Sequence, residues 1–290
     1  GVFLNADGSE MDWKATVPNG VSVGVPGTVR GWHEALTRYG TMSLARVLAP
    51  AIRVAEDGFE VGANFHRINK ANEAKFARFS TASALYLQDG KALPVGTRFH
   101  NPDLAQTYRD LARGGVKAFY EGPIAASMVA AVNHPPANPG VTVLAGSLSM
   151  ADLKDYEARL RQPVRSSYRG YEVYGMPAPS SGGIAIAQAL NILETFELTG
   201  KSRADIEHLY LEASRLAFAD RNAYVADEEF IDVPKDGLLS KAYARERARL
   251  IGAVAAPGKV AAGDPYPFEA DPSVPLRPQP RPLAQESTHT

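Results

Sequence analysis

Apolar residues recur at helical spacing along most of this chain. The clearest case runs from Leu44 to Ala55, where they fall three or four positions apart, and Ser43 just before it is a residue type that caps helices. Pro50 inside this run predicts a kink or a division into two short helices. Similar spacing predicts further helices over residues 30–39, 60–84, 101–113, 124–132, 152–156, 184–196 and 209–221.

Alternating apolar and polar positions indicate only a few short strands. Residues 21–25 alternate before the break at Pro26-Gly27, and residues 171–174 alternate again. Residues 85–94 are typical of a small hairpin whose turn is Asp89-Gly90, because this pair adopts the positive φ angles of tight hairpins. The pattern as a whole predicts a helix-rich protein with short strands.

The composition is that of a globular protein with a core, and it excludes several function classes. Of 290 residues, 45% are hydrophobic, and the formal net charge is −1, so no basic excess points to nucleic acid or to an anionic membrane. The sequence has no cysteine, its six histidines show no metal-ligand spacing, and no apolar run approaches the roughly 20 residues that span a bilayer. We therefore expect no nucleic-acid partner, no transmembrane segment in this chain, no metal and no cofactor.

A change of composition divides the chain near its end. Residues 253–285 are rich in Ala, Gly and Pro and show little periodicity, which is typical of an extended linker. We therefore expect residues 1–252 to form a folded domain and residues 253–290 to form a linker that leads to the chain end. Because the first residue is Gly1 and not methionine, we interpret the chain as an internal or processed piece of a longer protein.

The tetrapeptide Ser180-Ser181-Gly182-Gly183 lies where the expected strand at 171–174 leads into a helix. The first backbone N–H groups of a helix have no partner within it, so this turn could hold an anion or an oxyanion. The structural alternative is a helix cap whose glycines let the helix pack closely. The tetrapeptide does not fit the G-x-S-x-G turn of serine hydrolases, and both interpretations stay open.

Asp220 is a carboxylate on an otherwise apolar stripe of a predicted helix. It follows Leu209 by eleven residues, which is about three helical turns along the same face. Such a carboxylate could position a substrate or a loop, or it could be satisfied by an internal salt bridge or by backbone N–H groups. We favour the structural interpretation, because buried charges are usually paired.

The last five residues, Glu286-Ser287-Thr288-His289-Thr290, place hydroxyl side chains and a histidine after a proline-rich stretch. If the peptide bond before Thr290 is cut, the residue gains a free α-amine. That amine can take the proton from the threonine hydroxyl and turn it into a nucleophile. The alternative interpretation is an ordinary polar chain terminus.

Separate blocks of sequence resemble the gamma-glutamyltransferase family, and they follow the family's order along nearly the whole chain. Several collinear blocks are together far more specific than any one of them. The blocks are VPGTVRGW at 25–32, YGTMSL at 39–44, FYEG at 119–122, MPAPSSGGI at 176–184 and AFADR at 217–221.

The resemblance implies a precursor that cuts itself into a large and a small subunit, with this chain as part of the large one. It also implies an α+β N-terminal-nucleophile hydrolase fold, a four-layer αββα sandwich completed only by the small subunit. The family's small subunit begins with a threonine four residues after a recurrent glutamate, and Glu286 precedes Thr290 by four. This register makes Thr290 the nucleophile and places the cut after His289. A rival register starts at Ser287, but serine stands there where the family has threonine.

The resemblance further implies what the complete protein would do. We expect γ-glutamyl donors such as glutathione, a γ-glutamyl-threonine acyl-enzyme, and transfer to water, to an amino acid or to a dipeptide. The partner would be the small subunit, the location would be periplasmic or secreted, and residues 180–183 with Asp220 would support the active site. This chain alone would be inactive, because the family's oxyanion donors come mostly from the small subunit and its substrate-carboxylate arginine lies upstream of Gly1.

Two alternatives to this function stay open on the sequence. One is an amidase of the same fold, such as a cephalosporin or glutaryl acylase, which would use water only. The other is a non-catalytic homologue that serves as a scaffold. The residues that follow Thr290 in the gene would separate an enzyme from a scaffold.

Overall fold

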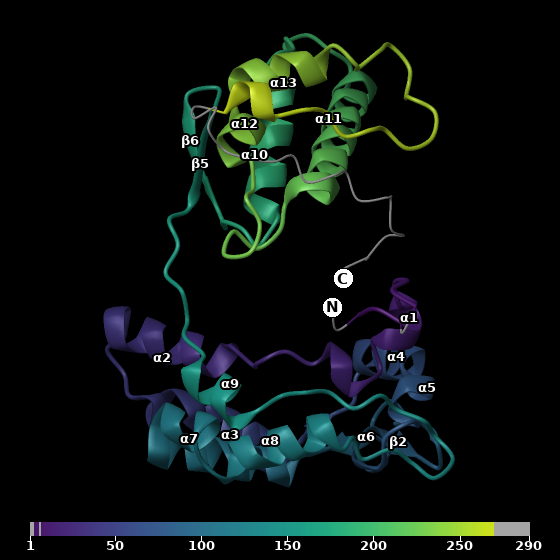
Figure 1. Ribbon diagram of the computed structural model, residues 1–290, viewed down its shortest axis with the longest axis vertical. Helices are drawn as coiled ribbons and strands as arrows, with labels where there is room; N and C mark the ends of the chain where they lie inside the picture. Colours follow the sequence, from purple (N-terminus) through teal and green to yellow (C-terminus); the bar gives the residue numbers. More distant parts are fainter. Residues whose placement is uncertain (1–2, 6, 270–290) are drawn as a thin grey trace. The chain divides into compact units, whose positions relative to one another are not determined.

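The computed structural model describes residues 3–5 and 7–269, which form two compact units (Figure 1). The first unit extends to Arg159, and the second begins at Leu160. Helices dominate both units, and each sheet within the described ranges consists of two antiparallel strands. Among the described residues, no helix is both long and apolar enough to cross a bilayer.

The first unit is built mainly from helices, of which α3 and α7 pack along each other. Its helices are α1 (Trp13–Thr16), the 3-10 turn η1 (Gly20–Ser22), α2 (Thr28–Tyr39), α3 (Leu44–Asp57), α4 (Ala63–Ala71), α5 (Glu73–Phe76), α6 (Ser80–Tyr86), α7 (Pro102–Tyr120), α8 (Pro123–Asn133) and α9 (Met150–Asp155). Its strands pair as β1 (Phe59–Glu60) with β4 (Arg98–Phe99) and as β2 (Leu87–Gln88) with β3 (Lys91–Ala92).

Helix α3 begins where the sequence predicts it, since the Ser43 hydroxyl accepts a hydrogen bond from the Arg46 amide at 3.3 Å. The expected division at Pro50 is wrong, because the proline lies inside one helix. Helix α3 packs along α7 over this region. The expected helix stop at Gly114-Gly115 is confirmed, because Gly115 leaves the helical conformation with a φ of 61° and a second helical segment follows it within the range of α7.

The hairpin between residues 85 and 94 is confirmed, whereas the strand expected at 21–25 is wrong. Asp89 and Gly90 form the hairpin turn with φ angles of 51° and 73°. In the other segment, the Gly20 amide donates to the Leu144 carbonyl oxygen at 2.8 Å, and the Val23 amide turns back to the Gly20 carbonyl oxygen at 3.1 Å. These backbone groups are therefore not available for a strand ladder.

A buried tyrosine joins two of the sequence blocks in the core of the first unit. Tyr120 is fully buried, and its hydroxyl donates to the Pro26 carbonyl oxygen at 2.6 Å. The same hydroxyl accepts a hydrogen bond from the Arg30 amide at 3.1 Å, and the Arg30 guanidinium lies 4.7 Å from the ring centre. The block at 119–122 thus fixes the turn that starts α2. The surrounding core consists of Val29, Leu48, Leu111, Ala125, Val132, Leu148 and Leu153.

The second unit packs several helices and one hairpin around helix α10. Its strands β5 (Val164–Tyr168) and β6 (Tyr171–Gly175) pair with Val164 opposite Gly175. Its helices are α10 (Gly182–Leu193), α11 (Arg203–Tyr224), α12 (Lys235–Leu239), α13 (Lys241–Ala248) and the 3-10 turn η2 (Tyr266–Phe268). Helix α10 lies between the hairpin and α11 (Figure 1), and it contacts α11, α12, α13 and both strands.

Residues 253–269, the first part of the expected linker, pack onto the second unit. The Tyr224 hydroxyl donates to the Gly263 carbonyl oxygen at 2.6 Å, and the Phe268 ring lies 5.4 Å from that of Tyr243. The segment is thus held both by its backbone carbonyl oxygens and by side chains such as Tyr266 and Phe268, which pack against the core of the unit. The remainder of the expected linker, from residue 270, lies outside the described residues.

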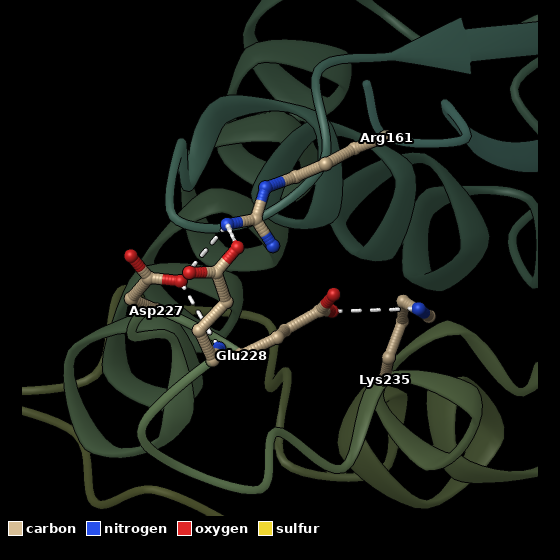
Figure 2. Close-up of polar contacts among 5 residues, drawn as sticks. Arg161, Asp227, Glu228 and Lys235 are labelled. Carbon is tan, nitrogen blue, oxygen red and sulfur yellow. Dashed lines mark hydrogen bonds and ion pairs between the residues drawn. The ribbon is translucent and has the colours of Figure 1, made fainter. Parts of the chain in front are cut away.

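Ion pairs tie the first residues of the second unit to the turn after α11. The Arg161 guanidinium contacts the Asp227 carboxylate at 3.1 Å and the Glu229 carboxylate at 3.2 Å, while Lys235 approaches Glu228 at 3.4 Å (Figure 2). One arginine thus bridges two carboxylates of the same turn. The contacts fix the segment that leads into β5 against the 227–229 turn.

Candidate functional site

The expected anion-binding turn lies between β6 and α10. Two glycines, Gly175 and Gly183, let the end of the strand and the start of the helix approach closely. A Cβ atom at Gly183 would lie 2.2 Å from the Met176 carbonyl oxygen, and one at Gly175 would lie 2.6 Å from the Gly183 Cα. The strand and the helix therefore pack as closely as expected if the glycines of residues 180–183 serve to cap and pack the helix.

At the N-cap of α10, the Ser181 side chain meets a side chain from α11. The Ser181 hydroxyl accepts a hydrogen bond from the Arg221 Nε atom at 2.8 Å. Ser181 makes no side-chain cap bond to its own helix, and its neighbours Ser180 and Gly182 are exposed. The guanidinium adds positive charge beside the N-terminal amides of α10, which favour negative charge. Such a corner suits an anionic group, and its place in an active site remains a prediction.

Asp220 is fully buried, and both of its carboxylate oxygen atoms are occupied. One oxygen accepts from the Gly263 amide at 2.8 Å and pairs with the Arg247 guanidinium at 3.1 Å. The other accepts from the Tyr243 hydroxyl at 2.9 Å and from the side-chain amide of Gln188. These are the contacts of a group that holds three helices and the 263 segment together, as the structural interpretation expects.

The same network raises the pKa of the Tyr243 hydroxyl well above its ordinary value. Burial of the ring is the main cause, and the neighbouring Asp220 charge adds to it. The tyrosine is therefore a fixed hydrogen-bond donor to Asp220, not a proton-transfer group at neutral pH. If Asp220 supports an active site, it does so by fixing the positions of helices α10 and α13.

Sequence reasoning missed the partners of Asp220. Tyr243 and Arg247 stand four residues apart and therefore share one face of α13 with two buried alanines, Ala244 and Ala248. A tyrosine and an arginine at this spacing beside small residues could have indicated a buried polar face. Nothing in the sequence pattern could have paired that face with Asp220, more than 20 residues earlier.

The expected nucleophile and cleavage residue cannot be placed relative to these groups. Thr290 and His289 lie outside the described residues, as do Glu286 and Ser287. The structure thus brings residues 180–183 next to Arg221. At a separate place it brings Asp220 together with Gln188, Tyr243, Arg247 and Gly263. Among the described residues, no group of three acidic or histidine side chains is placed to hold a metal ion.

Comparison with known proteins gives collinear similarity over most of the chain. The sequence profile of the family described as gamma-glutamyltranspeptidase matches residues 2–280. The acylase ACY 1 proenzyme of Pseudomonas sp. (strain V22) is 42% identical over 79% of this chain, and the glutathione hydrolase proenzyme of Bacillus subtilis (strain 168) is 33% identical over 92%. The chain spans 40% and 44% of the lengths of these two relatives.

The structure is similar to that of a solved gamma-glutamyltranspeptidase. Helicobacter pylori gamma-glutamyltranspeptidase superposes with a TM-score of 0.76 and 32% sequence identity. The superposition covers 88% of this chain and 71% of the solved one. The likeness therefore extends to both compact units.

Proposed function

We propose, from the premise that this chain belongs to the gamma-glutamyltranspeptidase family, that it is part of an enzyme that cleaves γ-glutamyl amides such as glutathione. The γ-glutamyl group would pass to water, to an amino acid or to a dipeptide. The observation that carries this proposal is the family match over residues 2–280, together with relatives that are named glutathione hydrolase proenzymes.

Family membership and the solved neighbours confirm the predicted fold class. The chain is the helix-rich part of an α+β N-terminal-nucleophile hydrolase fold. Its described sheets each have two strands, so the four-layer sandwich of the complete protein draws on strands besides these.

The proposed maturation step uses the hydroxyl of Thr290. Its oxygen attacks the His289 carbonyl carbon, the peptide C–N bond breaks, and the nitrogen takes a proton to become the free α-amine of Thr290. Water then opens the resulting ester, which leaves a carboxylate on His289 and restores the hydroxyl. The relatives' names as proenzymes support a precursor that is processed in this way.

The proposed catalytic cycle repeats the same chemistry on a substrate. The α-amine of Thr290 accepts the hydroxyl proton as the oxygen attacks the γ-glutamyl carbonyl carbon, and the proton then passes to the departing amine. Water or an acceptor amine resolves the acyl-enzyme. Each tetrahedral state needs hydrogen-bond donors, which we assign to the small subunit.

The described residues would act by holding the framework of this site. Residues 180–183 fix the start of α10, and Asp220 fixes α10 against α13 and the 263 segment. That segment is the last described stretch before the region that would reach Thr290. We propose that these groups position the chain end and do not touch substrate.

Expression of the complete gene with Thr290→Ala and Thr290→Ser tests the proposal. We expect the wild-type precursor to appear as two chains, the smaller of which begins with Thr290 by N-terminal sequencing. Thr290→Ala should stay as one chain and lose glutathione turnover. Thr290→Ser should retain self-cleavage and glutathione turnover, each at a reduced rate. An uncut wild-type protein that turned over glutathione at full rate would refute the mechanism.

A Ser287→Ala variant is the matched control for the register of the cut. Ser287 is also a hydroxyl residue of the chain end, three positions before Thr290. We expect this variant to be processed and active. Loss of processing in Ser287→Ala, with normal processing of Thr290→Ala, would instead support the rival register.

A water-only acylase is the second candidate function, and one observation favours it. The acylase ACY 1 proenzyme is 42% identical to this chain, compared with 33% for the Bacillus subtilis glutathione hydrolase. Assays of the mature protein with glutathione and with a glutaryl amide, each with and without a dipeptide acceptor, separate the two. Acceptor-stimulated glutathione turnover supports the transferase, and acceptor-independent release of glutarate supports the acylase.

Inactivity on both substrates in a normally folded, processed protein would support the scaffold alternative. A periplasmic or secreted location is part of the same proposal, and it rests on family resemblance alone. Fractionation of cells that express the complete gene would test it.

A further inference from the structure

A cavity of about 570 Å³ with a strongly charged lining lies in the first unit, between helix α2 and the residues that end and follow helix α9. On α2, its lining residues stand four positions apart and therefore share one face of the helix. We call it the charged cavity, and its charged lining residues are Arg30, Glu34, Arg38, Lys154, Asp155 and Glu157. Small-molecule sites commonly enclose roughly 300–1,000 Å³, so this cavity has room for a ligand.

The guanidinium of Arg30 is ordered by contacts within the unit. Its Nε atom donates to the Tyr156 carbonyl oxygen at 3.2 Å, and the group lies 4.7 Å from the ring centre of the buried Tyr120. The two terminal nitrogen atoms of Arg30 have no hydrogen-bond partner among the described residues. A guanidinium that is already ordered loses little side-chain entropy when its two-pronged donor face binds a carboxylate.

Only part of the remaining charge in the cavity is neutralised by the protein. Two ion pairs account for three of its lining residues, Arg38 with Glu34 at 3.1 Å and Glu157 with Arg159 at 3.2 Å. Lys154 and Asp155 form no ion pair with any residue that the structure describes, and the same holds for Arg30. The charged cavity therefore presents two positive charges and one negative charge that lack a counter-charge.

We propose that the charged cavity binds an acidic α-amino acid. Such a molecule carries two carboxylates and one ammonium group at neutral pH, which is the complement of the charges that the protein leaves unpaired. Arg30 and Lys154 each bind a carboxylate, and Asp155 binds the ammonium group. The inference goes beyond the proposed function and does not depend on it.

The mixed signs of the lining oppose simpler ligands. An inorganic anion such as phosphate would lie beside the free carboxylate of Asp155, and a polyamine would lie beside Arg30 and Lys154. Like charges brought together in this way reduce affinity. A ligand that carries both signs satisfies all three groups.

Equilibrium dialysis of the complete protein with labelled L-glutamate tests the assignment. We expect saturable binding to the wild type, and about tenfold weaker binding in Lys154→Gln and in Asp155→Asn, because each removes one charge-assisted contact. Both side chains are exposed, so neither substitution should disturb folding. Lys117→Gln is the matched control, since it removes an exposed lysine of the same unit outside the cavity, and it should bind as the wild type does.

Glutarate distinguishes this cavity from any other place where glutamate binds, because it has both carboxylates but no ammonium group. The wild type should prefer L-glutamate to glutarate. Asp155→Asn should bind the two about equally, whereas Lys154→Gln should keep the preference while it binds both more weakly. A change in ligand preference at one position is a result that a general loss of structure does not produce.

Arg30→Lys gives a further readout, because lysine keeps the charge but lacks the planar fork. It should also weaken L-glutamate binding, with Tm as the measure of folding; if Tm falls, the Lys154 and Asp155 variants decide. The proposal is overturned if the wild type shows no saturable binding at millimolar L-glutamate, if Lys154→Gln and Asp155→Asn bind like the wild type, or if Asp155→Asn keeps the full preference over glutarate. Displacement of L-glutamate by equimolar inorganic phosphate would equally overturn it, in favour of a simple anion site.

Discussion

The carboxylate of Asp220 accepts hydrogen bonds from groups that only folding brings together. Its partners come from α10, from α13 and from the Gly263 segment, and its exposure and that of the Arg247 side chain are 0% and 5%. Removal of one partner of such a pair leaves the other charge buried and unpaired. Substitution of Asp220 alone should therefore reduce the stability of the protein strongly.

Asp220→Ala in the complete protein should lower the free energy of unfolding by about 3–5 kcal/mol, because Arg247 would lose its counter-charge in a buried position. Urea unfolding measures the change. Glu207→Ala is the matched control, since Glu207 is an exposed acid of the same helix paired with Arg203, and we expect a change within about 1 kcal/mol. Equal effects of the two substitutions would contradict the structural role of Asp220.

The Glu269 carboxyl makes a pH-dependent contribution to the stability of the protein. Burial raises the pKa of its carboxyl, and the hydrogen bond from the Gly237 amide opposes this only in part. The native state then binds the proton more tightly than the unfolded state does. The stabilising contribution is present below the ordinary glutamate pKa and is lost as pH rises through the raised one.

Glu269→Gln should therefore gain stability relative to the wild type as pH rises above the ordinary glutamate range, because glutamine cannot ionise. Urea unfolding of both proteins across the acidic to neutral range gives the difference. We expect a small difference at acidic pH that grows towards neutral pH. A difference independent of pH would show that the carboxyl titrates as in the unfolded chain.

At the scale of elements, the turn between β6 and α10 shows how far local sequence determines structure. The strand at 171–174 and the following helix are predicted from periodicity and confirmed. The closeness of their ends depends on the contact between Gly175 and Gly183, which no periodicity reveals. Residues 21–25 show the reverse case, because the first of them belong to the 3-10 turn Gly20–Ser22 and the amides of Ser22 and Val23 bond back to Asn19 and Gly20.

Two adjacent glycines of α10 give a matched test of this turn. Gly183→Ala should destabilise the protein by about 1–3 kcal/mol, because its Cβ would lie 2.2 Å from the Met176 carbonyl oxygen and the backbone would have to shift. Gly182→Ala meets nothing within 4 Å and should be neutral or up to ~1 kcal/mol stabilising. Thermal unfolding of the two variants compares them, and similar shifts in Tm would contradict the close packing.

At the scale of the whole molecule, the described chain consists of two units, and the second includes residues that composition assigns to a linker. The Arg215 guanidinium donates to the Ala256 carbonyl oxygen at 2.9 Å and also to that of Gly258. The Arg247 guanidinium donates to the Ala261 carbonyl oxygen at 2.9 Å. Buried and half-buried arginines thus hold the segment through its backbone.

Arg215→Ala should loosen this segment, because two of its carbonyl oxygens lose their donor and the buried Glu212 carboxylate loses its counter-charge. Limited digestion with a lysine-specific protease should then cut faster after Lys259 than in the wild type. Arg203→Ala, an exposed arginine of the same helix that contacts Glu207, is the control and should leave the cut rate unchanged. Equal rates in all three proteins would show that Arg215 does not hold the segment.

The sequence by itself determined the helix-rich character, most helix positions, the hairpin at Asp89-Gly90 and, through collinear blocks, the family and its fold class. These features depend on neighbours within a few positions or on motifs that the chain carries intact. Only the tertiary structure decided the partners of Asp220, the close approach of Gly175 to Gly183, and the packing of residues 253–269. Each of these depends on groups far apart in the sequence, where periodicity and local propensity carry no information.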